Sequence, residues 1–334
     1  MKKVIFLFYF IFTLIFTSLY LGLFQLAKIT NKRIDYFPKL VINTLQNKST
    51  ASRNILVLGL DPRDDKIEKT NTTDTIMLAK VSSKDLRIIS IPRDLWVYSL
   101  SKKVNQIYEL SQTQTDRYQY LKTNFEKLTN QKIDNLLIIT SKNLIDIIKI
   151  VGGVDVQLEI GFKDTQYPNP EYIKNPNPNI PIYKTVEFKS GLVHLDETNV
   201  VEFVRSRHGA ETAALNGTDL GRINRQQLLI NALQQKLLNL PKNINSLKIL
   251  LNLYNYYSHS IETDLEDQQL FSLAYQLLPN LDKFSINKTV VPTSENNTTP
   301  IYHPNFNING AWVFIPKEKN YQSLHNYIND YFKD

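Results

Sequence analysis

Residues 54–94 read NILVLGLDPRDDKIEKTNTTDTIMLAKVSSKDLRIISIPRD. Three short apolar runs lie in this stretch, at 54–60, 75–81 and 86–91, and polar segments separate them. Runs of this length that end at turn residues are typical of buried β-strands. The stretch therefore predicts three strands with charged side chains beside their ends.

Helical patterns alternate with further strands along the rest of the chain. Residues 116–131 have helical spacing, 133–140 is another apolar run, and a helix at 142–151 ends at two glycines. Such alternation predicts an α/β sandwich with a mainly buried sheet. The remaining elements that we expect are a strand from 154, a Pro- and Asn-rich surface loop or lid at 161–185, helices at 196–206, from Asp219, at 244–257 and at 264–277, strands at 290–293 and 311–316, and a last helix at 318–331.

Residues 4–27 carry no charged side chain. About 20 apolar residues span a bilayer, whereas the apolar region of a secretory signal is shorter and a cleavage site follows it. We therefore expect a short cytoplasmic end and a transmembrane signal anchor over 1–27, a juxtamembrane stalk over 28–52, and one extracytoplasmic domain over 53–334. This organisation predicts a single-pass protein of the cell membrane with its large domain outside.

Composition narrows the class of partner. Hydrophobic residues make up 42% of the 334 residues and charged residues 21%, so the chain can bury a full core. The formal net charge of +7 favours acidic partners, but no Lys- or Arg-rich run of the nucleic-acid type occurs, so we expect no nucleic acid. The absence of cysteine excludes disulfides, thiolate metal sites and a cysteine nucleophile.

Four of the ten arginines lie in FVRSRHGAETAALNGTDLGRINRQQL, residues 203–228. A planar guanidinium can grip an oxyanion with two parallel hydrogen bonds, which an ammonium cannot do. Arg222, Arg225 and Gln226 would share one face of the helix from Asp219, near its start, where free N–H groups also favour anions. The stretch suggests a phosphate clamp, and a solvated basic helix start is the alternative.

Two aspartates beside strand ends, Asp61 and Asp74, are the candidate metal ligands. Two carboxylates, with phosphate oxygens and water, are the ligands that Mg²⁺ prefers. Arg63 and Arg93 occupy similar places, where α/β folds bind ligands, and Asp74 joins them only if its strand runs antiparallel to the others. The alternatives are a turn at Asp61, a loop end at Asp74 and structural ion pairs for the arginines, with Asp94 orienting Arg93.

Seven motifs follow the predicted anchor in order: NILVLGLDPR (54–63), TDTIMLAKV (73–81), ISIPRDLWV (89–97), KVNQIY (103–108), VGGVDV (151–156), EFVRSRH (202–208) and DLGRINRQQ (219–227). Together they resemble the LytR-CpsA-Psr proteins, bacterial ligases of cell-wall glycopolymers, over about 53–240. The resemblance implies a three-layer α/β/α sandwich with a central mixed sheet and an apolar pocket for a polyprenyl chain, preceded by one N-terminal transmembrane helix.

The resemblance also implies the site residues. The aspartates that match Asp61 and Asp74 hold Mg²⁺ near a pyrophosphate in this family. The residues that would surround the pyrophosphate are Arg63, Arg93, Arg205, Arg207, Arg222, Arg225 and Gln226. All of these arginines except Arg63 are also expected to act in catalysis.

The activity that the resemblance implies is a phosphotransfer. A peptidoglycan sugar hydroxyl would attack the phosphorus that carries the glycan and release the polyprenyl phosphate. The expected partners are a polyprenyl-pyrophosphate-linked glycan, such as a teichoic acid or a polysaccharide, peptidoglycan and the membrane, with Mg²⁺ as cofactor. Two other hypotheses stay open: a non-catalytic polyprenyl-phosphate binder or regulator, and a pyrophosphatase in which water replaces the sugar.

Overall fold

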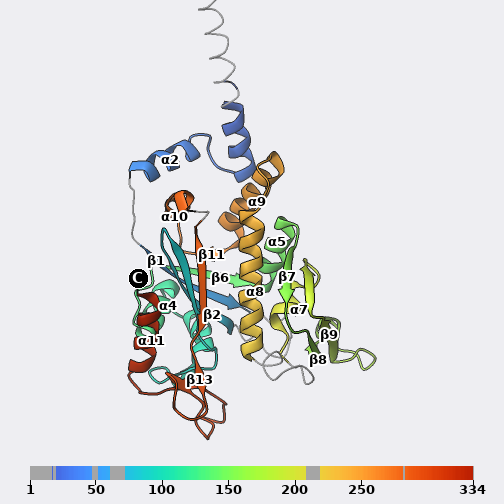
Figure 1. Ribbon diagram of the computed structural model, residues 1–334, viewed down its shortest axis with the longest axis vertical. Helices are drawn as coiled ribbons and strands as arrows, with labels where there is room; N and C mark the ends of the chain where they lie inside the picture. The colour runs from blue at the N-terminus through green and yellow to red at the C-terminus, as the bar shows by residue number, and fades with distance from the viewer. Residues whose placement is uncertain are drawn as a thin grey trace, which may run out of the picture.

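The computed structural model describes Thr17 and residues 20–46, 52–60, 72–207, 219–280 and 283–333. Within these residues, six strands form a central sheet in the order β11-β6-β1-β2-β3-β12 (Figure 1). Their bounds are β1 Arg53–Leu60, β2 Thr73–Val81, β3 Asp85–Ser90, β6 Asn135–Thr140, β11 Glu262–Thr263 and β12 Ser285–Val290. The three strands expected within residues 54–94 are β1, β2 and β3, and they are neighbours.

Strand directions make the sheet mixed. β1 is parallel to β6, and β3 is parallel to β12. β2 lies between β1 and β3 and is antiparallel to both. The amino end of β2 therefore meets the carboxyl ends of β1 and β3 at one edge of the sheet. This antiparallel direction is what Asp74 needs in order to lie beside the residues that follow β1 and β3. The predicted α/β class and mixed sheet are confirmed.

Helices cover both faces of the sheet (Figure 1). On one face, Phe125 and Ile328 belong to the same buried cluster as Leu58. On the other face, Ile230 packs beside Met77. The helices concerned are α4 Arg117–Thr129, α11 Gln322–Phe332 and α8 Asp219–Leu238. Because successive side chains of a strand point to opposite faces, apolar runs such as β1 can supply both clusters.

Helix α5 (Ser141–Val151) shows how local sequence sets the element boundaries. Its N-cap is Thr140, whose hydroxyl accepts a hydrogen bond from the Asn143 backbone N–H, and the helix begins at Ser141, one residue before the start that we expected. Gly152 ends the helix in the left-handed region at φ 73°, as the pair of glycines predicted. A side chain at that position would be strained, so glycine is the residue that ends helices most readily.

The Pro- and Asn-rich segment 161–185 is not the surface loop or lid without regular structure that we expected. It contains β8 (Phe162–Pro168), a short helix α6 (Pro170–Lys174) and the start of β9 (Tyr183–Phe188), and β8 pairs with β9. Buried Phe162 and Phe188 stack with ring centroids 5.1 Å apart. The expectation was wrong because the prolines and asparagines gather between the two strands, whereas the strands themselves alternate buried and exposed residues.

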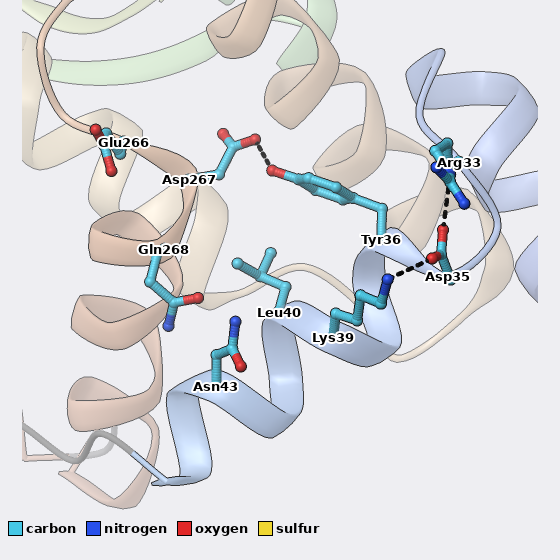
Figure 2. Close-up of a pocket in the computed structure, with 9 residues that line it drawn as sticks. All are labelled: Arg33, Asp35, Tyr36, Lys39, Leu40, Asn43, Glu266, Asp267 and Gln268. Atoms are coloured by element: carbon cyan, nitrogen blue, oxygen red, sulfur yellow. Dashed lines mark hydrogen bonds and ion pairs between the residues drawn. The ribbon is translucent and has the colours of Figure 1, made fainter.

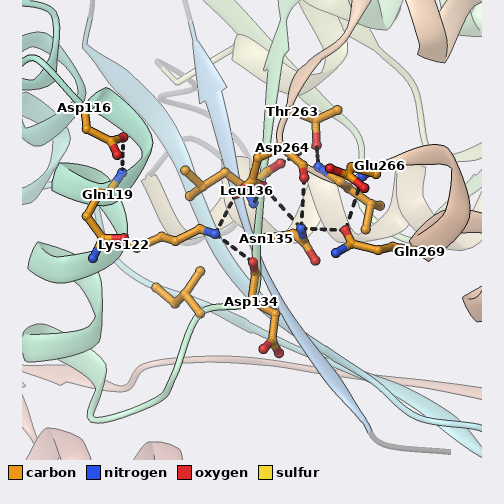
Figure 3. Close-up of polar contacts among 12 residues, drawn as sticks. Asp116, Gln119, Lys122, Asp134, Asn135, Leu136, Thr263, Asp264, Glu266 and Gln269 are labelled. Atoms are coloured by element: carbon orange, nitrogen blue, oxygen red, sulfur yellow. Dashed lines mark hydrogen bonds and ion pairs between the residues drawn. The ribbon is translucent and has the colours of Figure 1, made fainter. Parts of the chain in front are cut away.

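A polar network ties β6 to the helices on either side of it (Figure 3). Buried Asn135 donates from Nδ2 to the Asp264 carbonyl at 3.2 Å and to Gln269 Oε1 at 3.1 Å. Lys122 forms an ion pair with Asp264 at 2.5 Å. Because a buried polar group is costly when it lacks a partner, this network fixes where β11 and the following helix join the sheet.

The other described elements complete the domain. They are β4 Trp96–Val97, β5 Lys102–Lys103, a 3₁₀ turn Val104–Gln106, α3 Ile107–Ser111, β7 Val154–Leu158, β10 Gly191–Leu195, α7 Val200–Arg205, α9 Ile244–Ser260, α10 Asp267–Leu277, a 3₁₀ turn Leu278–Asn280, β13 Thr293–Ser294, β14 Ile301–Tyr302 and β15 Ile315–Pro316. The strand expected at 311–316 is thus reduced to β15, and the strand expected at 290–293 lies mostly earlier, as β12.

Residues 20–30 are helical, and α2 (Tyr36–Gln46) packs against α10. The segment 28–52, which we expected to be a stalk, therefore includes a helix that contacts the domain. Among the helices of the described ranges, none has both the length and the apolar character needed to cross a bilayer. Most of the predicted span 4–27 lies outside those ranges, so the anchor stays a prediction.

Asp267 is the polar centre of the contact between α2 and α10. It accepts hydrogen bonds from the hydroxyls of Tyr36 and Tyr254, the second at 2.8 Å, and Lys32 Nζ lies 3.3 Å away. Burial and the Asp267 hydrogen bond raise the pKa of Tyr254 to about 12, so this phenol stays protonated and donates. Burial alone would raise the pKa of Asp267, but the two tyrosine hydrogen bonds and Lys32 hold it below 3.8.

We predict that Asp267→Asn loosens α2 at neutral pH. A hydrogen bond to a charged acceptor stabilises by about 1.5–3 kcal/mol, so the free energy of opening α2 should fall by about that amount. Since the folded pKa is depressed, the stabilisation is present above 3.8 and is lost as the pH falls through the folded value. Hydrogen exchange of α2 amides in both proteins, at neutral and acidic pH, measures the difference.

The control for this prediction is Asp35→Asn in the same segment. Asp35 pairs with exposed Lys39, and exposed ion pairs contribute little. Equal exchange rates for α2 in Asp267→Asn and in the unaltered protein would show that the contact does not depend on the carboxylate.

Candidate functional site

An apolar pocket of about 350 Å³ lies between the sheet and the helices α5, α7 and α8. Its apolar lining consists of Val57, Gly59, Leu60, Met77, Leu137, Ile139, Leu144, Ile147, Val204, Leu229, Ile230 and Leu233. Polar and charged groups also line it, namely Asp74, Thr75, Thr140, Ser141, Arg205, Arg222 and Gln226. The pocket therefore offers apolar walls together with one carboxylate and two guanidiniums.

Gly59 allows β1 and β2 to approach each other at the wall of this pocket. A Cβ atom at Gly59 would lie 2.6 Å from the Cβ atom of Thr75, its partner in the ladder. Carbon atoms in real proteins do not approach so closely, so a side chain here would push the strands apart. Close packing of β1 on β2 thus explains why the apolar run 54–60 contains a glycine at position 59.

Asp74 occupies an irregularity of the β1–β2 ladder. Gly59 pairs with Thr75 and Leu60 pairs with Thr73, which leaves Asp74 as the extra residue of a β-bulge. Bulges redirect a side chain and are frequent beside active sites. The bulge lets Asp74 turn toward the residues that follow β3 and toward α8 instead of continuing the alternation of the strand.

Two arginines from distant parts of the chain contact Asp74. Arg93, which follows β3, forms an ion pair with Asp74 Oδ1. Arg222 of α8 places Nη1 3.5 Å from Oδ2 and donates from Nη2 to the Asp74 backbone carbonyl at 2.9 Å. The Arg222 side chain is only 2% exposed, so its charge lies within the protein beside a carboxylate.

The charges around Asp74 determine its ionisation. Burial alone would raise the pKa of this carboxyl, but Arg93, Arg222 and Arg207 outweigh burial and hold the pKa below 3.8. Asp74 is therefore an anion at neutral pH. A carboxylate that stays ionised beside several guanidiniums can bind a cation or orient those guanidiniums toward an added anion.

Asp94 is a partner of Arg93, which was one of the alternatives drawn from the sequence. Its Oδ2 lies 3.4 Å from Arg93 Nε, and Lys103 donates to its Oδ1 at 2.6 Å. Asp94 therefore bridges two cations next to the site. This position orients Arg93 toward Asp74.

Arg205 and Arg207 stand at the end of α7. Arg205 lines the pocket together with Arg222 and Gln226. Arg207 lowers the pKa of Asp74 through its charge, and its backbone N–H donates to Asp164 Oδ2 at 2.8 Å. Two segments that are 17 residues apart, at 205 and at 222, thus contribute positive charge to one place.

Arg225 has a different environment from Arg222, although both lie on α8. Its Nε donates to the Phe203 carbonyl at 2.8 Å, its Nη2 donates to the Ser206 carbonyl, and the guanidinium lies 4.2 Å from the Phe162 ring centre. Burial, and to a lesser degree Arg222, lowers its pKa to about 10. These contacts cap the carbonyl end of α7, and Arg225 is not among the residues that line the pocket.

Sequence reasoning missed Asp164. This side chain is 1% exposed, and the backbone N–H groups of Gln166 and Arg207 donate to it. Its negative charge favours the charged form of Arg225. The available signal was the position of Asp164 two residues after Phe162, which places both side chains on the same, buried face of a strand. The Pro- and Asn-rich composition of the segment hid this signal.

Two of the site residues predicted from the sequence, Asp61 and Arg63, lie outside the described residues. Asp61 directly follows Leu60, which pairs with Thr73 beside the bulge. No group of three or more acidic or histidine side chains able to hold a metal occurs within the described ranges. The ionised Asp74 is a suitable oxygen ligand for Mg²⁺, so a site there would need Asp61, phosphate oxygens and water as further ligands.

The model of the LytR_cpsA_psr family matches residues 23–330. The chain belongs to this family. The match covers most of the chain, and it confirms the resemblance that the seven motifs carried. The pocket between sheet and α8, with Asp74 and the arginines beside it, is therefore the candidate site of a LytR-CpsA-Psr protein.

Individual relatives are distant in sequence. The chain is 25% identical over 240 residues to TagU of Enterococcus faecalis, a polyisoprenyl-teichoic acid–peptidoglycan teichoic acid transferase, with 70% of this chain and 68% of TagU covered. The crystal structure of TagV from B. subtilis aligns with a TM-score of 0.57 at 19% identity, over 85% of this chain and 98% of TagV. A structure of TagT bound to LIIa-WTA aligns with a TM-score of 0.53 at 16% identity, over 84% of this chain and 90% of TagT. These structures share the fold.

We predict that Arg225→Lys lowers stability. Lysine keeps the charge, but one ammonium cannot reproduce the hydrogen bonds to two carbonyls, so the free energy of unfolding should fall by about 1.5–3 kcal/mol. Denaturant unfolding followed by circular dichroism measures this change. Lys236→Arg on the same helix is the control and should be within about 0.5 kcal/mol of the unaltered protein. An unfolding curve of Arg225→Lys that overlies the control would contradict the capping role.

Proposed function

We propose that this protein transfers a glycopolymer from a polyprenyl-pyrophosphate carrier to a peptidoglycan sugar hydroxyl at the outer side of the cell membrane. The observation that carries the proposal is a single pocket with apolar walls and with Asp74, Arg205 and Arg222 in its lining. A lipid-linked pyrophosphate needs this combination, since one part of the molecule is apolar and the other carries several negative charges. The name of TagU, a polyisoprenyl-teichoic acid–peptidoglycan teichoic acid transferase, supports a lipid-linked glycopolymer as the substrate.

The lipid chain would lie between the sheet and α8. The pocket-lining residues of α8 run from Arg222 to Leu233, and 11 residues at 1.5 Å each make about 16 Å of helix. Burial of apolar surface gives about 25 cal/mol per Å², so the lipid would supply most of the affinity. The apolar walls have little chemical specificity and would accept any polyprenyl chain that fits.

The pyrophosphate would lie beside Asp74, where Arg93, Arg205, Arg207 and Arg222 gather. These guanidiniums neutralise the ground-state charge and stabilise the charge that develops on the leaving polyprenyl phosphate. Arg63 would join them. Arg225 would act indirectly, because its hydrogen bonds to the carbonyls at the end of α7 hold Arg205 and Arg207 in place.

At phosphorus, the reaction forms one bond and breaks one. The acceptor hydroxyl oxygen bonds to the phosphorus that carries the glycan. The bond from that phosphorus to the bridging oxygen breaks, and the oxygen leaves with the polyprenyl phosphate. The O–H bond of the acceptor also breaks, and its proton passes to solvent water. Asp94 is engaged by Lys103 and Arg93, which favours an orienting role over a role as general base.

Magnesium, if bound by Asp74 and Asp61, would neutralise further charge on the pyrophosphate oxygens. The residues of this chain do the rest: they hold the pyrophosphate in one orientation and keep the lipid out of water. Phosphoryl transfer depends mainly on positioning and on charge stabilisation.

A three-way incubation tests the proposal. The purified full-length protein in detergent receives a polyprenyl-pyrophosphate-linked glycan with peptidoglycan acceptor, without acceptor, or with acceptor and a metal chelator. We expect glycan on the peptidoglycan and free polyprenyl phosphate in the first arm alone. Release of polyprenyl phosphate without acceptor would show a pyrophosphatase, and tight binding without turnover would show a lipid binder or regulator. Both results would overturn the transferase.

We predict that Arg222→Lys reduces kcat/KM roughly 10- to 150-fold, the equivalent of one charge-assisted hydrogen bond of about 1.5–3 kcal/mol. The ammonium keeps the positive charge, but it cannot bond Asp74 and a phosphate oxygen with the geometry of a planar fork. Initial rates of transfer measure the change. Lys236→Arg, farther along α8, is the control and should leave kcat/KM unchanged. A value for Arg222→Lys within threefold of wild type would contradict the clamp.

A further inference from the structure

Helix α2 has two apolar faces, and among the residues that the structure describes only one of these faces is packed against the domain. Phe37 and Leu40 are buried against the domain, where Phe37 packs beside Tyr254 and Phe271. Val41, Ile42 and Leu45 are 48%, 52% and 46% exposed. At 100° per residue these three side chains form an arc beside the buried face, so apolar side chains extend well beyond the contact with the domain.

The polar face of α2 is separate from both apolar faces. Figure 2 shows Lys39 near Tyr36, which points to Asp267, and Asn43 further along α2, across from the α10 residue Gln268. Lys39 pairs with Asp35, and its side chain is 70% exposed. Such a separation of a polar, cationic side from an apolar side characterises helices that lie in the plane of a membrane surface.

The described end of the uncharged run, residues 20–27, lies at the same end of the molecule as α2. It belongs to the helix over residues 20–30, on which Leu21 and Phe24 are 53% and 48% exposed. Figure 1 shows that α2 runs across the direction of this helix and lies level with its lower part, at the end of the molecule opposite β13. Helix α2, which carries the exposed arc, therefore lies at the end of the molecule where residues 20–30 join the domain.

We propose that the arc formed by Val41, Ile42 and Leu45 lies in the surface of the lipid bilayer, so that α2 is held between membrane and domain. The bilayer is the favoured occupant because the apolar run ends at this face. Lys28, Arg33 and Lys39 also lie in this short segment, and such side chains extend toward lipid phosphates while their stems cover apolar surface.

This contact would orient the domain as well as attach it. α8 runs along the direction of the helix over residues 20–30, with its beginning away from that helix (Figure 1). If the proposed function holds, the Leu233 end of the pocket lies nearer to the bilayer than the Arg222 end. A polyprenyl chain could then enter the pocket from the membrane while its pyrophosphate lies at the far end.

Single-cysteine labelling tests the membrane contact without relying on activity. The chain contains no cysteine, so Ile42→Cys, Leu45→Cys and Leu192→Cys each carry one label. Leu192 on β10 is 73% exposed and serves as the control outside the arc. The full-length variants are labelled with an environment-sensitive fluorophore and reconstituted into phosphatidylglycerol and phosphatidylcholine vesicles, with and without spin-labelled lipid.

We expect a blue-shifted emission and strong quenching by the spin-labelled lipid at positions 42 and 45, and neither effect at position 192. Unquenched labels at 42 and 45 would overturn the proposal. In that case a blue shift would indicate a protein partner or a second copy on the arc, and water-like emission would indicate an open surface. Because the readout needs no turnover, it is independent of the transfer assay, and failure of one leaves the other intact.

Discussion

The ion pairs of Asp74 join three parts of the chain that are far apart in sequence. Arg93 comes from the turn after β3, Arg222 comes from α8, and Asp74 itself comes from a bulge at the start of β2. A buried guanidinium needs a partner of opposite charge, so Arg222 fixes the approach of α8 to the sheet. The apolar pocket exists in the space that this approach leaves between α8 and the sheet.

The same helix shows two uses of arginine three residues apart. Arg222 lines the pocket and contacts Asp74, whereas Arg225 is committed to the backbone carbonyls of Phe203 and Ser206. The capping by Arg225 places the end of α7, and with it Arg205, against the pocket. A cluster of like charges is therefore stable here because some of its members are satisfied by carbonyl groups and carboxylates before any phosphate binds.

The contact between α2 and α10 likewise depends on one carboxylate. Asp267 gathers Tyr36, Tyr254 and Lys32, so the segment between the predicted anchor and the sheet has a defined place on α10. A segment that packs on the domain can transmit orientation, which a flexible stalk cannot do. The position of the pocket relative to the bilayer would then depend on α2 as well as on the sheet.

Sequence alone determined the strands β1, β2 and β3, the start of α8 and the arginines beside them, because apolar runs, turn residues and an unusual local use of arginine are local signals. It also carried the seven motifs that place the chain in its family. Only the tertiary structure decided that β2 runs antiparallel, that Asp74 occupies a bulge, that Arg225 caps α7, and that Asp164 and the strands around it are buried. Each of these depends on which distant residue supplies the partner, since pairing direction and ion-pair choice are set by packing between segments and not by the residues of one segment.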